Sequence, residues 1–209
     1  IIFEITTDCN LSCAYCYNHW KRENTYHRLN SYKKARNTLN QLFKTSDISH
    51  VTFTGGEPFL SERFIELILF CRLNNKTVSI ISNGNAANYT DYKTAISLGV
   101  KLFQFPILSE KNEIHDNLTG VKGSWDKSFT SITEVLSLGG FVVPVIVLTK
   151  RNYTELENTL TFLHNSGLHR IMLNRYNIGG KGVLGNDLTL TKSEIEKAFY
   201  VANNIASKT

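Results

Sequence analysis

The feature that most limits the fold of this chain is a repeated unit, in which a short apolar and β-branched run is followed by a helical pattern. Six such runs predict strands, at residues 1–6, 50–55, 77–82, 100–107, 141–149 and 168–174. Helical patterns follow them at residues 31–44, 61–73, 89–98, 124–138, 153–165 and 192–206. Six strand–helix units predict a parallel sheet covered by helices, and six are fewer than the eight that close a TIM barrel. We therefore expect an α/β fold, an open partial (β/α)6 TIM-like barrel with parallel strands, as a single domain over residues 1–209.

Composition and charge narrow the class of protein further. Of the 209 residues, 42% are hydrophobic, which is enough for a substantial core. No apolar run approaches the roughly 20 residues that a membrane-spanning helix needs, and no signal-peptide pattern is present, so we expect a cytoplasmic protein without a membrane or nucleic-acid partner. The net charge is +5, and basic residues gather at 20–36. Such a run predicts a solvated helix face, with a docking face for an acidic peptide or a phosphate as the alternative.

In parallel α/β folds, functional sites gather beyond the carboxyl ends of the strands. Cys9, Cys13 and Cys16 follow the first predicted strand with the spacing C-x3-C-x2-C, and soft thiolates at this spacing can surround one metal centre. One interpretation is a structural zinc site with His19 as the fourth ligand. Another is a [4Fe–4S] cluster with one iron left open, because Cys71 lies in an apolar helical pattern typical of a core residue. An odd group of three thiols fits a disulfide framework poorly.

The sequence TGGEPF follows the second predicted strand. Gly55 and Gly56 permit a close approach of the backbone, and Glu57 presents a carboxylate beside it. Such a loop suits an ammonium group. By itself the motif is weak, since a turn with a surface glutamate has the same sequence.

Together these residues resemble the radical S-adenosylmethionine (radical SAM) superfamily. The family signature C-x3-C-x-Φ-C, in which Φ is aromatic, is met by Cys9, Cys13, Tyr15 and Cys16, and its GGE motif is met by residues 55–57. The resemblance implies that the three thiolates hold a [4Fe–4S] cluster whose open iron chelates S-adenosylmethionine. It further implies that reductive cleavage of this cofactor yields a 5′-deoxyadenosyl radical, which abstracts hydrogen from a substrate. The resemblance thus explains why the motif has three cysteines: the fourth iron of the cluster binds the cofactor instead of a thiolate.

The resemblance also implies which residues bind the cofactor. Tyr15 is expected near the adenine, residues 55–57 are expected to hold the methionine amino group, and the SNG turn at 82–84 is expected to face the cofactor. The expected cofactor-binding residues are Tyr15, Tyr17, Gly55, Gly56, Glu57, Ser82, Asn83, Gln104 and Asn174.

One segment departs from the family pattern. Relatives have a Ser-x-Asp-Gly turn after the fourth strand, where this chain has PILS. Pro106 has no hydroxyl and Leu108 has no carboxylate, so neither can make the corresponding hydrogen bonds. Ribose recognition is therefore expected to shift, with Gln104 or Asn174 as the candidates, or to be weaker.

Downstream segments resemble the peptide- and protein-modifying members of the family, the SPASM-type maturases. The passage EIHDNLTGVKGSW at 113–125 and the passage HRIMLNRYNIGGKG at 169–182 carry this resemblance. It implies a peptide or protein substrate and an external electron donor of the flavodoxin or ferredoxin type. His115 and Asp116 are expected to organise the loop after the fourth strand rather than to catalyse. No cysteine cluster follows Cys71, so we expect a core domain without the auxiliary-cluster domain of these relatives, consistent with a fragment.

Three hypotheses from different classes follow. The first is a radical SAM enzyme that acts on a peptide or protein side chain, with no catalytic side chain beyond the cluster and cofactor, or in a variant on a small molecule. The second is an iron–sulfur protein that transfers electrons or binds a partner without cleaving the cofactor. The third is a structural zinc domain.

Overall fold

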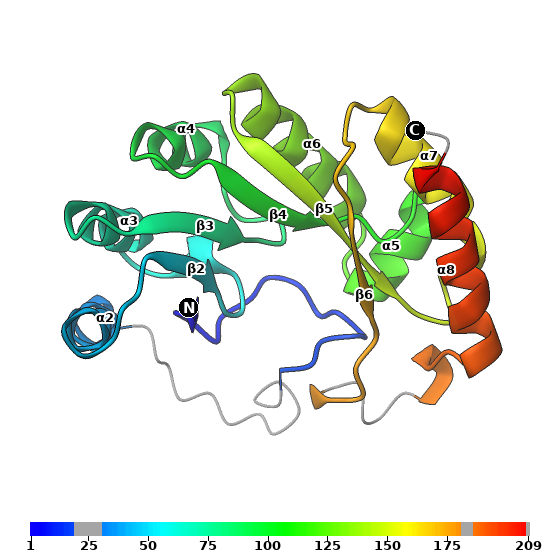
Figure 1. Cartoon of the computed structure of the whole chain (residues 1–209), viewed down its shortest axis with the longest axis horizontal. Coiled ribbons are helices and arrows are strands. Elements are labelled where there is room, and N and C mark those ends of the chain that lie inside the picture. Colours follow the sequence, from blue (N-terminus) through cyan, green and yellow to red (C-terminus); the bar gives the residue numbers. More distant parts are fainter. Residues whose placement is uncertain (19–30, 181–185, 208–209) are drawn as a thin grey trace. The chain divides into compact units, whose positions relative to one another are not determined.

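The computed structural model describes residues 1–18, 31–180 and 186–207 of the chain. Strands and helices alternate along it, with the labels shown in Figure 1. The strands are β1 (Ile2–Glu4), β2 (His50–Thr54), β3 (Thr77–Ile81), β4 (Leu102–Pro106), β5 (Phe141–Leu148) and β6 (Met172–Arg175). The α-helices are α2 (Tyr32–Thr45), α3 (Phe64–Leu73), α4 (Tyr89–Ser97), α5 (Asn112–Thr119), α6 (Ser124–Ser137), α7 (Leu156–Asn165) and α8 (Lys192–Ala206). Short 3-10 helices are η1 (Pro58–Leu60), η2 (Tyr153–Glu155) and η4 (Asn186–Leu188).

The six strands form one sheet in the order β1-β2-β3-β4-β5-β6. The pairs β1–β2, β2–β3, β3–β4 and β5–β6 are parallel, and a row of apolar residues runs across the first four strands in register, through Phe3, Phe53, Ile80 and Phe103. Consecutive parallel strands joined by helices are the topology of a (β/α) barrel with fewer than eight units. The predicted α/β partial TIM-like barrel is confirmed.

Most predicted elements are present, although several begin or end a few residues from their predicted bounds, and two of the differences have clear local causes. Helix α3 begins at Phe64 instead of residue 61, because Pro58 opens the 3-10 helix η1 and Arg63 adopts a left-handed φ of 56°. Helix α5 was not predicted, and the expectation of a loop at His115 and Asp116 was wrong. This helix has only 8 residues, too few for a repeated apolar period to show.

Side-chain caps fix two helix starts as the sequence indicates. Ser31 Oγ accepts from Lys34 N at 3.4 Å at the start of α2. Helix α8 begins with a capping box, the arrangement for which the sequence TKSE at 191–194 is typical: Glu194 N donates to Thr191 Oγ1 at 3.3 Å, and Thr191 N donates to the Glu194 carboxylate at 2.7 Å. None of the described helices combines the length and apolarity that crossing a bilayer requires.

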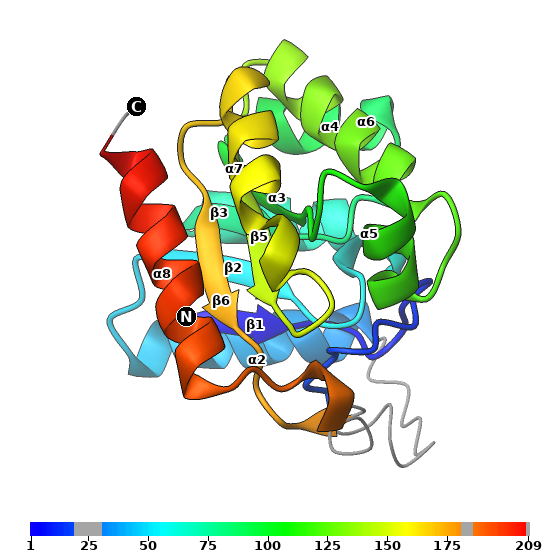
Figure 2. The same ribbon diagram turned by 90° about the vertical axis from the view of Figure 1, so that its right-hand side faces the viewer.

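The described residues group into two compact units, each built from separated stretches of chain. The first comprises those within 1–10, 26–105 and 128–142, and the second those within 11–25, 106–127 and 143–209. In the first unit α3 packs against α2, β3 and α4, and in the second α7 packs against α8 (Figure 2). The expectation of a single domain over the whole chain stays a prediction.

Each unit has its own core. In the first, aromatic rings meet edge to face in a continuous series, with centroid separations of 5.4 Å for Phe53–Phe64, 5.1 Å for Phe59–Phe64 and 5.5 Å for Phe59–Tyr92. In the second, Leu108, Leu118, Tyr176 and Leu188 form a buried cluster, against which Ala14, Tyr15, Ile114 and Val147 pack. These cores support the loops that follow the strands.

Candidate functional site

In the first unit, the loops after β1 and β2 lie in direct backbone contact. Gly56 N donates to Thr6 O at 2.7 Å, and Glu57 N donates to Asp8 O at 2.7 Å. A Cβ at Gly55 would lie 2.5 Å from Thr6 O, and a Cβ at Gly56 would lie 2.0 Å from Asp8 O. Only glycine avoids these collisions. The GGE motif therefore holds the backbone just ahead of the first cysteine.

Glu57 is completely buried, at 0% exposure, and its carboxylate contacts three donors. It accepts from the Ser82 hydroxyl at 2.9 Å, from Asn83 N at 2.7 Å and from Phe59 N at 3.2 Å. Burial raises the pKa of Glu57 to about 7, although the three hydrogen bonds act to lower it. The side chain thus joins the loop after β2 to the turn after β3. Its contact with an ammonium group of the cofactor stays a prediction.

The turn after β3 carries a network of side-chain amides that reaches the first cysteine. Asn83 Nδ2 donates to Asn10 Oδ1 at 2.8 Å and to Cys9 Sγ at 3.7 Å. Asn10 Nδ2 donates to Asn85 O at 2.9 Å, and Asn85 N donates to Asn83 Oδ1 at 2.7 Å. Sequence reasoning singled out Asn83 but missed Asn10 and Asn85, because amides that converge from separate loops leave no pattern of spacing.

In the second unit, the segment with the other two cysteines is anchored on α5. Ser12 N donates to Thr119 O at 3.0 Å, and Ala14 N donates to Leu118 O at 2.8 Å. Tyr15, expected near the adenine, packs against the buried leucine cluster. The helix that sequence reasoning missed therefore supports the loop carrying Cys13 and Cys16.

The segment after β6 also contacts this loop. A Cβ at Gly180 would lie 2.5 Å from Cys16 O and 2.6 Å from Asn18 O, and Gly180 has a positive φ of 52°. Of the passage NIGGKG at 177–182, residues 181 and 182 lie outside the described part of the chain. Gly179 and Gly180 bring a backbone without side chains against the second-unit cysteine segment.

At PILS (106–109), where the sequence departs from the family pattern, Leu108 is buried and its backbone is hydrogen-bonded to two side chains. Leu108 is 1% exposed, and its N–H donates to His115 Nδ1 at 3.2 Å, while its carbonyl accepts from Asn152 Nδ2 at 2.8 Å. His115 is fully buried, and burial lowers its pKa to about 4, so the ring is neutral at pH 7. Leu108 thus has an apolar side chain in the core of the second unit, where the family pattern has an aspartate.

Asp116 caps helix α6. Its carboxylate accepts from Gly123 N at 2.6 Å, from Ser124 Oγ at 2.9 Å and from Trp125 N at 2.9 Å. Burial acts to raise the pKa of Asp116, but hydrogen bonds from Trp125, Gly123 and Ser124 lower it below its ordinary value. His115 and Asp116 thus have structural roles, as predicted, but from within a helix.

The remaining predicted cofactor residues lie in different places. Tyr17 is 59% exposed. Gln104, on β4 in the first unit, accepts from Ser82 N through its backbone oxygen at 3.0 Å. Asn174 lies exposed on β6 in the second unit, in register with Val147. Their contacts with a ribose stay predictions.

None of the four cysteines forms a disulfide, and they fall into two kinds. Cys9, Cys13 and Cys16 are partly exposed, whereas Cys71 is 0% exposed and burial raises its pKa to about 12. Among the described residues no group of three or more His, Cys, Asp or Glu side chains is arranged to hold a single metal ion. The zinc alternative depended on His19, which lies outside the described residues. The three exposed thiols are a donor set that fits a [4Fe–4S] cluster, in which each thiolate binds a separate iron.

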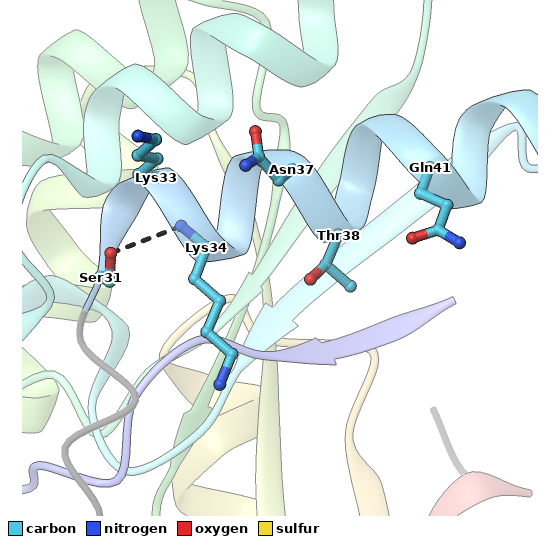
Figure 3. Close-up of a pocket in the computed structure, with 6 residues that line it drawn as sticks. All are labelled: Ser31, Lys33, Lys34, Asn37, Thr38 and Gln41. Carbon is cyan, nitrogen blue, oxygen red and sulfur yellow. Dashed lines mark hydrogen bonds between the residues drawn. The ribbon is translucent and has the colours of Figure 1, made fainter.

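The described residues form two surface hollows of about 330 Å³ each, and neither is lined by a residue predicted to bind the cluster or the cofactor. One lies along α2, where Figure 3 shows Lys33 and Lys34 with Asn37 and Gln41, and both lysines are exposed, as the predicted solvated face requires. The other, in the second unit, is lined by Leu148, Arg175, Tyr176, Asn177, Ile178, Thr189, Leu190 and Ile195. The rest of the basic run, residues 20–30, lies outside the described part of the chain.

Comparison with known proteins decides the family. The model of the radical SAM superfamily matches residues 3–163, which include the three cysteines of the motif, the GGE motif and the SNG turn. The chain belongs to the radical SAM superfamily. Proteins similar to it include the antilisterial bacteriocin subtilosin biosynthesis protein AlbA of Bacillus subtilis (strain 168), 26% identical over 188 residues, 86% of this chain and 40% of AlbA.

Another relative is a probable GTP 3′,8-cyclase of Saccharolobus islandicus (strain L.S.2.15 / Lassen #1), 27% identical over 201 residues, 92% of this chain and 63% of the relative. Among solved structures, native anSMEcpe with bound AdoMet and Cp18Cys peptide has the same fold, with a TM-score of 0.79 and 16% identity, covering 98% of this chain and 58% of the other. The chain therefore spans 40% to 63% of the length of these three proteins.

Proposed function

We propose that this chain is the core of a radical SAM enzyme that binds a [4Fe–4S] cluster through Cys9, Cys13 and Cys16, binds S-adenosylmethionine beside it, and acts on a peptide or protein side chain. The observation that carries the proposal is the contrast among the thiols. Three are partly exposed at the positions of the family motif, while Cys71 is buried with its pKa raised to about 12. Three available thiolates leave one iron of a cubane cluster without a protein ligand.

When bound, the cluster supplies the electron that cleaves S-adenosylmethionine to a 5′-deoxyadenosyl radical. The chain's own residues position and shield the reactants. Residues 55–57 are expected to hold the methionine moiety, and the close packing of Gly55 and Gly56 against Thr6 and Asp8 fixes the strand that leads to Cys9. Helix α5 fixes the loop that carries the other two ligands. The tasks of these residues are binding, orientation and exclusion of water. An external donor of the flavodoxin or ferredoxin type is expected to supply the electron.

A peptide substrate is supported by two of the similar proteins. AlbA is a bacteriocin biosynthesis protein, and anSMEcpe binds a peptide together with AdoMet. A small-molecule substrate is the second candidate, since the GTP 3′,8-cyclase relative matches 92% of this chain. Both candidates share the same cluster and cofactor.

Anaerobic reconstitution tests the cluster assignment. With iron and sulfide, the chain should gain the broad absorption near 400 nm that is a generic expectation for [4Fe–4S] clusters, and with dithionite and S-adenosylmethionine it should release 5′-deoxyadenosine. A colourless protein with bound zinc would contradict the proposal. An intact cluster that yields no 5′-deoxyadenosine would favour a carrier of electrons.

A matched pair of cysteine variants tests the ligands. Cys13→Ala should bind no stable cluster, because two thiolates remain, whereas Cys71→Ala should keep the full iron and sulfide content, because Cys71 is a core residue. A full cluster in Cys13→Ala, or its loss in a folded Cys71→Ala, would contradict the assignment.

Isotope transfer separates the two substrate classes. Perdeuterated cellular peptides and perdeuterated nucleotides are supplied separately to the reconstituted chain. Deuterium in the released 5′-deoxyadenosine should appear with the peptides, because the radical takes its hydrogen from the substrate. Deuterium that appears only with the nucleotides would favour the second candidate.

A further inference from the structure

We propose that the side-chain amide of Asn83 donates a hydrogen bond to the Cys9 thiolate and so raises the reduction potential of the cluster. This inference rests on the proposed function, since it requires a cluster bound through Cys9. It gives Asn83 the role of a positioning residue that acts on the cluster through one of its ligands.

The distances are consistent with the Asn83 side-chain amide donating hydrogen bonds to two acceptors. Asn83 Nδ2 lies 3.7 Å from Cys9 Sγ and 2.8 Å from Asn10 Oδ1. An amide nitrogen carries two hydrogens, so both contacts are possible at once. The longer distance to sulfur reflects the larger radius of that atom.

The orientation of the amide is fixed by the backbone of Asn85. Asn85 N donates to Asn83 Oδ1 at 2.7 Å, so the oxygen side of the Asn83 amide must face that N–H. Asn85 O accepts from Asn10 Nδ2 at 2.9 Å, which leaves Asn10 Oδ1 directed at Asn83. A flip of either amide would set donor against donor or acceptor against acceptor. The Asn83 nitrogen is thereby directed at the thiol side.

The backbone of Asn83 is also held from both sides. Its N–H donates to the buried Glu57 carboxylate at 2.7 Å, and its carbonyl accepts from Ser128 Oγ at 2.8 Å and from Asn85 Nδ2 at 2.9 Å. The amide is therefore preorganised, and little conformational freedom is lost when it contacts a thiolate. The GGE motif acts on Cys9 by this second route, through Glu57 and Asn83, in addition to its backbone contacts.

A hydrogen bond to a ligating sulfur withdraws negative charge from the cluster. The reduced cluster carries one more electron than the oxidised form, so the donor stabilises the reduced form more and raises the potential. Removing the Asn83 donor should therefore shift the midpoint potential to more negative values. Removing Asn10 should leave the Asn83–Cys9 contact in place.

A redox titration followed by electron paramagnetic resonance (EPR) tests this on the reconstituted chain, with Asn83→Ala and Asn10→Ala compared at equal iron content. We expect a negative shift in Asn83→Ala and the wild-type midpoint in Asn10→Ala. A wild-type midpoint in Asn83→Ala would overturn the inference. So would an equal shift in Asn10→Ala, because the amide network as a whole would then be responsible.

Pulsed EPR provides a second readout that does not depend on Asn83→Ala binding a cluster. With asparagine labelled by ¹⁵N in the side chain only, Asn10→Ala should still show coupling of a labelled nitrogen to the reduced cluster. Its absence would overturn the inference. If the wild type assembles no cluster, the proposed function fails together with this inference. If it assembles one and the midpoints coincide, only this inference fails.

Discussion

At the scale of single residues, the buried carboxylate of Glu57 sets a pH dependence. Its pKa is about 7 in the folded chain against an ordinary value of 4.5, so the folded state holds the proton more tightly than the unfolded state between these values. The stabilising contribution is fully present below pH 4.5 and is lost as the pH rises through about 7. Stability should therefore fall on going from pH 5 to pH 8.

Glu57→Gln isolates this effect, because the amide does not ionise. The free energy of unfolding of the wild type should fall by about 2–3 kcal/mol more than that of the variant between pH 5 and pH 8. Urea unfolding at constant ionic strength measures both. Parallel pH profiles for the two proteins would show that Glu57 keeps its charge when buried.

The sequence predicted a residue of the candidate site only where that residue belongs to a motif with fixed spacing. The cysteines and the GGE motif stand at fixed spacings, so their positions were apparent. Asn10 and Asn85 were not, since Asn10 meets Asn83 and Asn85 from a loop 73 and 75 positions away in the chain and no period connects them. The burial of Glu57 was likewise hidden, because a glutamate in a glycine-rich loop has the sequence of a surface turn.

At the scale of a loop, the contact between the GGE motif and the segment after β1 leaves no room for a side chain. Gly56→Ala should cost on the order of 3 kcal/mol or more, because the new Cβ would lie 2.0 Å from Asp8 O. Gly139→Ala is the control: its φ of 76° is unfavourable for alanine, unlike that of Gly56, but nothing lies within 4 Å of the new Cβ, so we expect a cost of about 1–2 kcal/mol. Thermal or urea unfolding compares them, and equal costs would contradict the steric account.

At the scale of a helix, Asp116 should stabilise α6 through its cap. Asp116→Ala removes an acceptor from three donors and should cost roughly 2 kcal/mol or more of unfolding free energy. Asp126→Ala removes a carboxylate from the first turn of the same helix, where the side chain is exposed, and should cost about 0.5 kcal/mol. Urea unfolding at pH 7 measures both changes. Similar losses in both would mean that charge alone is responsible, not the cap.

Strands and long helices followed from periodicity, whereas α5 did not. Its apolar side chains Ile114 and Leu118 stand one turn apart, a single interval that any loop can show. What makes it a helix is tertiary: Leu118 enters the buried cluster and its carbonyl accepts from Ala14. Packing of this kind is invisible until the partner segments are known.

At the scale of the whole molecule, cluster binding should add to folding stability. Under the proposed function only the folded chain binds the cluster, so a bound cluster shifts the folding equilibrium toward that state. The midpoint of thermal unfolding should fall when the cluster is removed by a chelator under oxidising conditions. Cys13→Ala, given the same treatment, should show no change. Equal midpoints for the cluster-bound and cluster-free wild type would contradict cluster binding by the folded state.

Gly180 has a practical consequence for anyone who wishes to redesign this protein. Its main chain leaves no room for a Cβ next to the carbonyls of Cys16 and Asn18. A library that randomises the stretch after β6 to alter selectivity would, at this one position, also deform the segment that carries Cys16, more than 160 positions earlier in the sequence. Ile178, two places before it and 62% exposed, offers a variable site without that penalty.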